Sequence, residues 1–143
     1  MRLGHEQFDL PVQAATTTTG LAATYACLAA TANEAADDVL REALRSPRTA
    51  VRAAALRTAM DRLSPNCQRW LIEHLHECDE TLRGRILAQR DIFTTAVREA
   101  ILSGNEQSCK NGCEAATWLK IYDLIPTLLA GTEDKSNPRQ PLI

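Results

Sequence analysis

The stretch that decides the fold is a helix-forming pattern that the chain uses twice. It reads DVLREAL at residues 38–44 and VRAAAL at residues 51–56. Thirty-one residues further on, the pattern returns as RWLIEHL at residues 69–75 and LRGRIL at residues 82–87. The matched positions are Val39 with Trp70, Leu40 with Leu71, Glu42 with Glu73, Leu44 with Leu75, Val51 with Leu82, Arg52 with Arg83 and Leu56 with Leu87. Two short amphipathic helices repeated at such a period are typical of a stacked helical solenoid, whose units bury each other's apolar faces.

The composition favours an all-α domain of ordinary size. The chain has 143 residues, of which 45% are hydrophobic and only 4% are aromatic. Ala, Leu, Arg and Glu dominate its middle and are strong helix formers. The clusters of Val, Ile, Tyr and Phe that would favour a sheet are missing. A domain of this length can bury a sizeable core.

Charge is distributed unevenly along the chain, although the net charge is only −2. Residues 41–98 contain 11 arginines and 7 acidic residues, a balance of +4. Residues 1–40 have 1 basic and 5 acidic residues (−4), and residues 99–143 have 4 basic and 6 acidic residues (−2). Because guanidinium groups pair well with carboxylates, we expect most of these arginines to form salt bridges within and between helices. The net charge by itself points to neither nucleic acid nor an anionic membrane.

The cysteines predict reduced thiols in a cytoplasmic protein. They are Cys27, Cys67, Cys78, Cys109 and Cys113, and their odd number and irregular spacing are unlike a secreted disulfide scaffold. The sequence has no apolar run of about 18 residues, so we expect no membrane-spanning helix and no membrane partner. A weakly apolar run at residues 20–32 ends in Ala-Thr-Ala, which makes a signal peptide the alternative. The acidic residues before this run favour an ordinary helix.

The helical repeat domain is expected at residues 20–131, between a flexible N-terminal arm at 1–19 and a flexible C-terminal tail at 132–143. Short polar motifs predict where its helices begin. Asn33 is expected to cap the helix that contains residues 38–44. Ser46-Pro47 and Ser64-Pro65 each resemble an N-cap followed by a proline at the first helical position, and Asp79 is a further cap.

A third unit is expected from Val97 onward, with a longer and more polar connection at residues 104–112. The tetrapeptide at residues 111–114, Asn-Gly-Cys-Glu, resembles a capping box and predicts a helix that begins there. Pro126 should kink this last helix or restart it. Gly131 is expected just past its end, where glycine is favoured.

The junction at residues 45–56, RSPRTAVRAAAL, resembles the turn of a HEAT repeat, in which a Val-Arg pair opens an Ala-rich second helix. Residues 78–83, CDETLR, resemble a second copy. The similarity covers residues 33–103, and it extends to 104–131 by helix pattern alone. The resemblance to HEAT-like, armadillo-type repeat proteins implies a right-handed α-solenoid of about three antiparallel helix pairs that serves protein–protein contact. The chain departs from the family pattern at Ser46-Pro47, where the turn aspartate typical of the family is absent.

We therefore expect a non-enzymatic protein-interaction or scaffold module with no cofactor. Arginines near the turns between helices would supply polar specificity, and a partly exposed tryptophan would anchor the partner. The expected partner-binding residues are Arg48, Arg52, Arg83, Arg85 and Trp118. The alternative for Trp70 and Trp118 is that both belong to the core.

Two other kinds of partner are left open. A nucleic acid would be bound if the arginines line one face and contact phosphates. In its extreme form this function is similar to that of the HEAT-like DNA glycosylases, but no motif here identifies a catalytic aspartate, and no Gly-rich phosphate loop is present. The last predicted helix is apolar on more than one face, so a homodimer or a longer repeat array is also expected there.

His74, Cys78, Cys109 and Cys113 are weak candidates for a metal site, because zinc takes cysteine and histidine ligands in a tetrahedron. We expect no metal, since no Cys-x-x-Cys pair occurs and Cys67 and Cys78 fit an apolar stripe. Cys113 is the best candidate for a reactive thiol, because a helix N-terminus and the nearby Lys110 would both lower its pKa. The expected outcome is nevertheless an inert, partly exposed cysteine.

Overall fold

The computed structural model describes residues 20–103, 105–133 and 141. A helix over residues 20–30 comes first. It is followed by α2 (Ala35–Leu44), α3 (Thr49–Arg62), α4 (Pro65–Glu73), the 3-10 turn η1 (Leu75–Glu77), α5 (Glu80–Ala88), η2 (Arg90–Phe93), α6 (Thr94–Leu102), α7 (Glu106–Trp118), η3 (Tyr122–Leu124) and α8 (Ile125–Glu133). These residues contain no β-strand, so the expected all-α class is confirmed.

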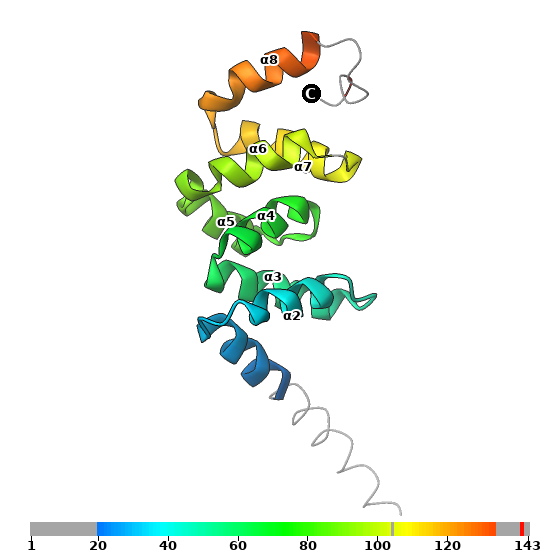
Figure 1. Ribbon diagram of the computed structural model, residues 1–143, viewed down its shortest axis with the longest axis vertical. Coiled ribbons are helices and arrows are strands. Elements are labelled where there is room, and N and C mark those ends of the chain that lie inside the picture. The colour runs from blue at the N-terminus through cyan, green and yellow to red at the C-terminus, as the bar shows by residue number, and fades with distance from the viewer. Residues whose placement is uncertain (1–19, 104, 134–140, 142–143) are drawn as a thin grey trace, which may run out of the picture.

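The helices are piled along the long axis of the molecule, with the helix over residues 20–30 near one end and α8 at the other (Figure 1). α2 packs on α3, α3 packs on α4, and α6 packs on α7. α4 also contacts both α6 and α7, and α3 contacts α5. The apolar core is consequently a column that runs between successive helices, and α4 lies at its centre.

Side-chain caps begin several helices where the sequence predicts them. The hydroxyl of Ser64 accepts a hydrogen bond from the backbone N–H of Cys67, and Asp79 accepts one from Leu82. The prediction at Asn33 is wrong by one residue, because the N-cap of α2 is Glu34 and no side chain caps it; Asn33 accepts from the N–H of Ala35 in the turn before the helix. The prediction at Ser46-Pro47 is wrong by two residues, because α3 begins at Thr49 with Arg48 as its extended N-cap. Ser46 instead closes a small turn by accepting from the N–H of Arg48.

Burial at the matched repeat positions agrees in some places and differs in others. Leu40 and Leu71 are both fully buried, and Leu44 and Leu75 are 5% and 0% exposed. Trp70 is 7% exposed whereas Val39 is 51% exposed, because α4 has helices on both sides and α2 lies near one end of the pile. Leu56 is buried in the 14-residue α3, but Leu87 is 43% exposed in the last turn of the 9-residue α5. Val39 and Leu87, although apolar and matched to buried residues, therefore do not face the core.

The predicted connection at residues 104–112 is also wrong. α7 begins at Glu106, and its cap is Asn105, whose side chain accepts from the N–H of Ser108. The tetrapeptide at residues 111–114 lies inside this helix and caps nothing. Gly112 lies where α6 approaches the backbone of α7 closely. A Cβ at this position would lie 2.8 Å from the backbone nitrogen of Ile101.

Of the two effects expected of Pro126, a kink or a restart of the helix, the structure has the restart, so the C-terminal part contains two helices. α7 ends at Trp118, the chain turns through Lys120 with a left-handed φ of 55°, and η3 leads into α8. Pro126 is the second residue of α8, where its missing N–H costs no helical hydrogen bond. Gly131 lies within α8, and so do Thr132 and Glu133, which were expected in the tail. The predicted arm at 1–19 and the rest of the tail, apart from residue 141, lie outside the described residues.

A buried ion pair joins the first three helices, and the sequence patterns did not indicate it. Nε of Arg62 donates to Asp37 Oδ1 at 2.5 Å, and the other carboxylate oxygen accepts from Ser64 at 2.9 Å and Asn66 at 3.1 Å. The same guanidinium donates to the carbonyl oxygens of Leu28, Thr31 and Asn33, which end the helix over residues 20–30 and lead into α2. Burial alone would raise the pKa of Asp37, but the hydrogen bonds from Arg62, Asn66 and Ser64 outweigh it and lower the pKa.

Candidate interaction surface

Arg52 and Arg83, predicted to bind a partner, are engaged inside the molecule. Nε of Arg52 donates to Glu77 Oε2 at 2.6 Å, and Nη1 donates to the carbonyl of Ser46 at 2.8 Å. Arg83 makes equivalent bonds further along the chain, with Glu114 at 2.7 Å and the carbonyl of Leu75 at 2.9 Å. Each arginine thus ties the start of its helix to the preceding turn and to an acidic residue of a later element.

The acidic partner of Arg52 shows the strength of this pairing. Burial by itself would raise the pKa of Glu77, but hydrogen bonds from Arg52 and His74 outweigh that effect and hold the pKa below its usual range. The side chains of Arg52 and Glu77 are 23% and 21% exposed. A phosphate or carboxylate from a partner would have to displace an internal acid to reach this guanidinium.

Two further arginines form a reciprocal pair of bridges between α3 and α5. Arg85 on α5 donates to Asp61 on α3 at 2.6 Å, and Arg57 on α3 donates to Asp79 at the start of α5 at 3.2 Å. All four side chains are well exposed, so these bridges add little stability by themselves. They do neutralise the basic groups on this side of the molecule.

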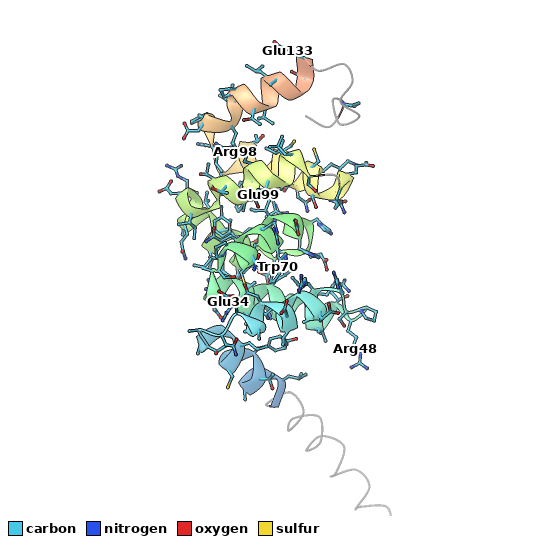
Figure 2. The ribbon with its side chains drawn as sticks, in the orientation of Figure 1. Glu34, Arg48, Trp70, Arg98, Glu99 and Glu133 are labelled. Atoms are coloured by element: carbon cyan, nitrogen blue, oxygen red, sulfur yellow. The ribbon has the colours of Figure 1, made fainter. Side chains whose placement is uncertain are left out.

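Arg48 differs from the other three predicted arginines. It lies in the turn before α3, and its side chain extends into solvent (Figure 2). None of the residues that the structure describes forms an ion pair with it. Three of the four predicted arginines are therefore paired with acidic residues of other elements, and of these four only Arg48 presents an unneutralised charge.

The two tryptophans have different environments. Trp70 belongs to the core at 7% exposure, as the alternative for this residue predicted. Trp118 is half-buried at the edge of the core, and the guanidinium of Arg83 lies 5.9 Å from its ring centroid. The cation–π contact covers part of the ring that a partner would otherwise reach.

The candidate metal ligands do not come together. In the described part of the chain, no three His, Cys, Asp or Glu side chains are close enough to hold a metal ion. Cys78 is buried, its thiol faces the carbonyl oxygens of Leu71 and His74, and burial raises its pKa to about 12. Cys109 is fully buried on α7. The apolar roles predicted for Cys67 and Cys78 are confirmed, because both belong to the core cluster.

The two effects that were expected to lower the pKa of Cys113 are both absent from its surroundings. Cys113 lies in the middle of α7 rather than at a helix N-terminus, and Lys110 is paired with Glu106 at 2.6 Å. Burial, with the neighbouring thiol of Cys109, raises the pKa of Cys113 to about 11. A thiol with this pKa is protonated near neutral pH and is a poor nucleophile.

A surface groove between α4 and α6 was not indicated by any sequence motif. Its volume is about 320 Å³, and it is lined by Pro65, Asn66, Gln68, Arg69, Ile92, Thr95, Ala96 and Glu99. Ile92 is 42% exposed and forms its apolar part together with Pro65 and Ala96. Arg69 on one wall is held by Asn66 and, more loosely, by Glu73. Glu99 on the other wall is exposed and has no ion-pair partner among the residues that the structure describes (Figure 2).

A second exposed apolar area lies at the C-terminal end of the pile. Tyr122, Ile125 and Leu129 are 68%, 47% and 56% exposed, and α8 has no fully buried residue. The expectation of an apolar surface on the last helix is consistent with this exposure. In the described residues, no helix is both long enough and apolar enough to cross a membrane.

Comparison of the chain with protein-family models, with curated proteins and with solved structures finds no match.

Proposed function

We propose that this chain is a non-enzymatic protein-interaction or scaffold module of the HEAT-like kind. In this arrangement α2 with α3, α4 with α5, and α6 with α7 would form three antiparallel pairs of a right-handed solenoid. The piling of the helices along one axis supports it (Figure 1). So do the equivalent bonds of Arg52 and Arg83, which start α3 and α5 in the same way.

The observation that carries the choice of a protein partner is the neutralisation of the arginines. Arg52, Arg83 and Arg85 each have a carboxylate within 2.7 Å. A surface that binds nucleic acid needs cations free to replace counterions on the phosphates. A surface of paired charges with small apolar areas resembles the polar rim of a protein–protein interface.

The groove between α4 and α6 is the contact region that we favour. Ile92 would receive an aliphatic side chain, and the free carboxylate of Glu99 would receive a lysine or arginine. Asn66, Gln68 and Thr95 on the rim would hydrogen-bond to the partner's backbone. The partner segment would therefore combine a basic residue with an apolar one.

Affinity capture from the native host tests this function, with the wild-type chain and the double variant Ile92→Asp, Glu99→Lys as baits. Both residues are exposed, so the variant is expected to fold. We expect one or more proteins to be retained by the wild type and lost from the variant. Equal retention by both baits argues against the groove, and retention of no protein argues against the module.

Nucleic-acid binding is the second candidate, and the free side chain of Arg48 favours it. A titration of double-stranded DNA at several salt concentrations distinguishes the two functions. Several phosphate contacts would produce a steep decrease of affinity with salt, with a slope near −0.9 per contact. We expect weak binding with a slope of about one or less, and a slope of several units would favour the alternative.

Self-association, or continuation of the repeat array, is proposed for the exposed residues Tyr122, Ile125 and Leu129. Light scattering over a range of concentrations tests it, since a strict monomer at high concentration would exclude a homodimer.

We also infer a reducing, cytoplasmic location, because all five cysteines are free thiols. Fractionation of host cells checks this location.

A further inference from the structure

Asn111 is a buried polar side chain on α7 that contacts both the end of α4 and η1. It is 1% exposed. Its amide nitrogen donates to the carbonyl oxygen of Glu73 at 2.7 Å and lies 2.9 Å from Nδ1 of His76. Its side-chain oxygen accepts from Nε2 of Gln107 at 3.0 Å. Because a carbonyl can only accept, the amide nitrogen has to face Glu73, and the orientation of the Asn111 amide is determined.

This orientation determines where the His76 ring carries its proton. The amide nitrogen of Asn111 is a donor, so Nδ1 of His76 must be the acceptor. The ring is then neutral, with its proton on Nε2, which faces Glu77 at 3.9 Å. With a proton on Nδ1, the N–H of His76 and the N–H of the Asn111 amide would point at each other, and neither could accept a hydrogen bond. Turning the Asn111 amide over would relieve this clash, but it would set the Asn111 oxygen against the Glu73 carbonyl.

The charged groups around His76 provide no other acceptor for Nδ1. Glu77 lies on the Nε2 side and already accepts from Arg52 on α3 at 2.6 Å and faces Nδ1 of His74 at 3.0 Å. The His74 ring is stacked on the His76 ring with centroids 6.2 Å apart, so charge on both rings would be repulsive. The charged side chains of α7 on either side of Asn111 are engaged elsewhere, Lys110 with Glu106 and Glu114 with Arg83.

We propose that the contact between η1 and α7 is an acid-sensitive joint, closed while His76 is neutral and loosened when Nδ1 takes up a proton. We expect the loosening to be confined to the contact between η1 and α7, because α7 also packs on α6 and α4. The bonds of η1 to Arg52 and Arg83 do not involve the His76 ring.

NMR spectroscopy of the full chain labelled with ¹⁵N tests the joint directly. At about pH 7.5, long-range ¹H–¹⁵N correlations should identify His76 as the tautomer protonated on Nε2. On lowering the pH to about 5.5, the hydrogen-exchange protection of η1 and α7 amides, corrected for intrinsic exchange, should fall about tenfold relative to α3, because an orphaned buried donor shifts a local opening equilibrium by about this factor. The opposite tautomer overturns the proposal without any variant.

Two variants separate His76 from its neighbour. His76→Asn keeps an acceptor near the position of Nδ1 that cannot take up a proton, so the α7 protection should be the same at both pH values. His74→Asn removes the stacked ring but keeps the contact between His76 and Asn111, so the tenfold change should persist. A pH response that survives in His76→Asn, or that vanishes in His74→Asn, refutes the joint.

Discussion

Replacement of Gly112 by alanine should destabilise the protein, although glycine in the middle of a helix is normally unfavourable. α6 approaches α7 closely at this residue. A Cβ at residue 112 would lie 2.8 Å from the backbone nitrogen of Ile101 and 3.0 Å from both Ala100 Cβ and Ile101 Cγ1. The nearest atom belongs to the backbone of a helix, so it cannot rotate away as a flexible side chain would. The two helices have to separate instead.

The size of the effect follows from two opposing contributions. Glycine to alanine in a helix interior stabilises by about 1 kcal/mol through backbone entropy. Overpacking a tight contact costs about 1–3 kcal/mol, and a backbone clash at 2.8 Å belongs to the upper part of this range. We therefore expect a net destabilisation of about 1–2 kcal/mol.

Gly84 provides a matched control for this substitution. It lies in α5, and a Cβ there would meet no atom within 4 Å, so Gly84→Ala should stabilise by up to about 1 kcal/mol. Urea unfolding followed by circular dichroism measures both variants, whose free energies of unfolding should differ by about 2 kcal/mol or more. If Gly112→Ala is as stabilising as Gly84→Ala, the close approach of α6 and α7 is refuted.

Three other substitutions or reactions test particular parts of the structure. Trp70→Ala should lower the free energy of unfolding by about 3–5 kcal/mol and Val39→Ala by less than about 1 kcal/mol, because the first side chain is buried and the second is exposed. Equal losses of stability in thermal denaturation would contradict this difference in burial. The lowered pKa of Asp37 contributes stability that is full above its usual pKa near about 4 and is lost as the pH falls through the lower folded value, so unfolding midpoints should fall more steeply with acid in the wild type than in Asp37→Asn. In a timed alkylation near pH 8, read by mass spectrometry, exposed Cys27 should react well before Cys78, whose pKa is about 12; faster labelling of Cys78 would show that its burial is wrong.

Local signals in the sequence predicted what depends on neighbouring residues. Ser64-Pro65 and Asp79 begin helices as expected, because a cap bonds to an N–H only three residues away. The same reasoning failed at residues 111–114, where an Asn-Gly pair resembles a helix start. Gly112 serves the approach of another helix, and Asn111 serves a carbonyl 38 residues away. No local pattern distinguishes these uses from a cap.

The candidate interaction surface could be predicted only in part. The expectation that most arginines form salt bridges agrees with the bridges of Arg52, Arg62, Arg83 and Arg85. Their acidic partners lie between 24 and 31 residues away, so the choice of partner depends on which helices become neighbours. The groove lined by Glu99 and Ile92 arises from the spacing of α4 and α6, and no motif in either helix predicts it.

The amino-acid sequence by itself determined that this chain is helical and where several of its helices begin, since apolar spacing, alanine content and capping residues act over one or two turns. The tertiary structure alone decided which of two matched residues is buried, which of the four predicted arginines remains free and which histidine ring contacts a buried amide. These outcomes depend on the number and distance of the helices around each position, and such neighbours are brought together only when the whole pile has formed.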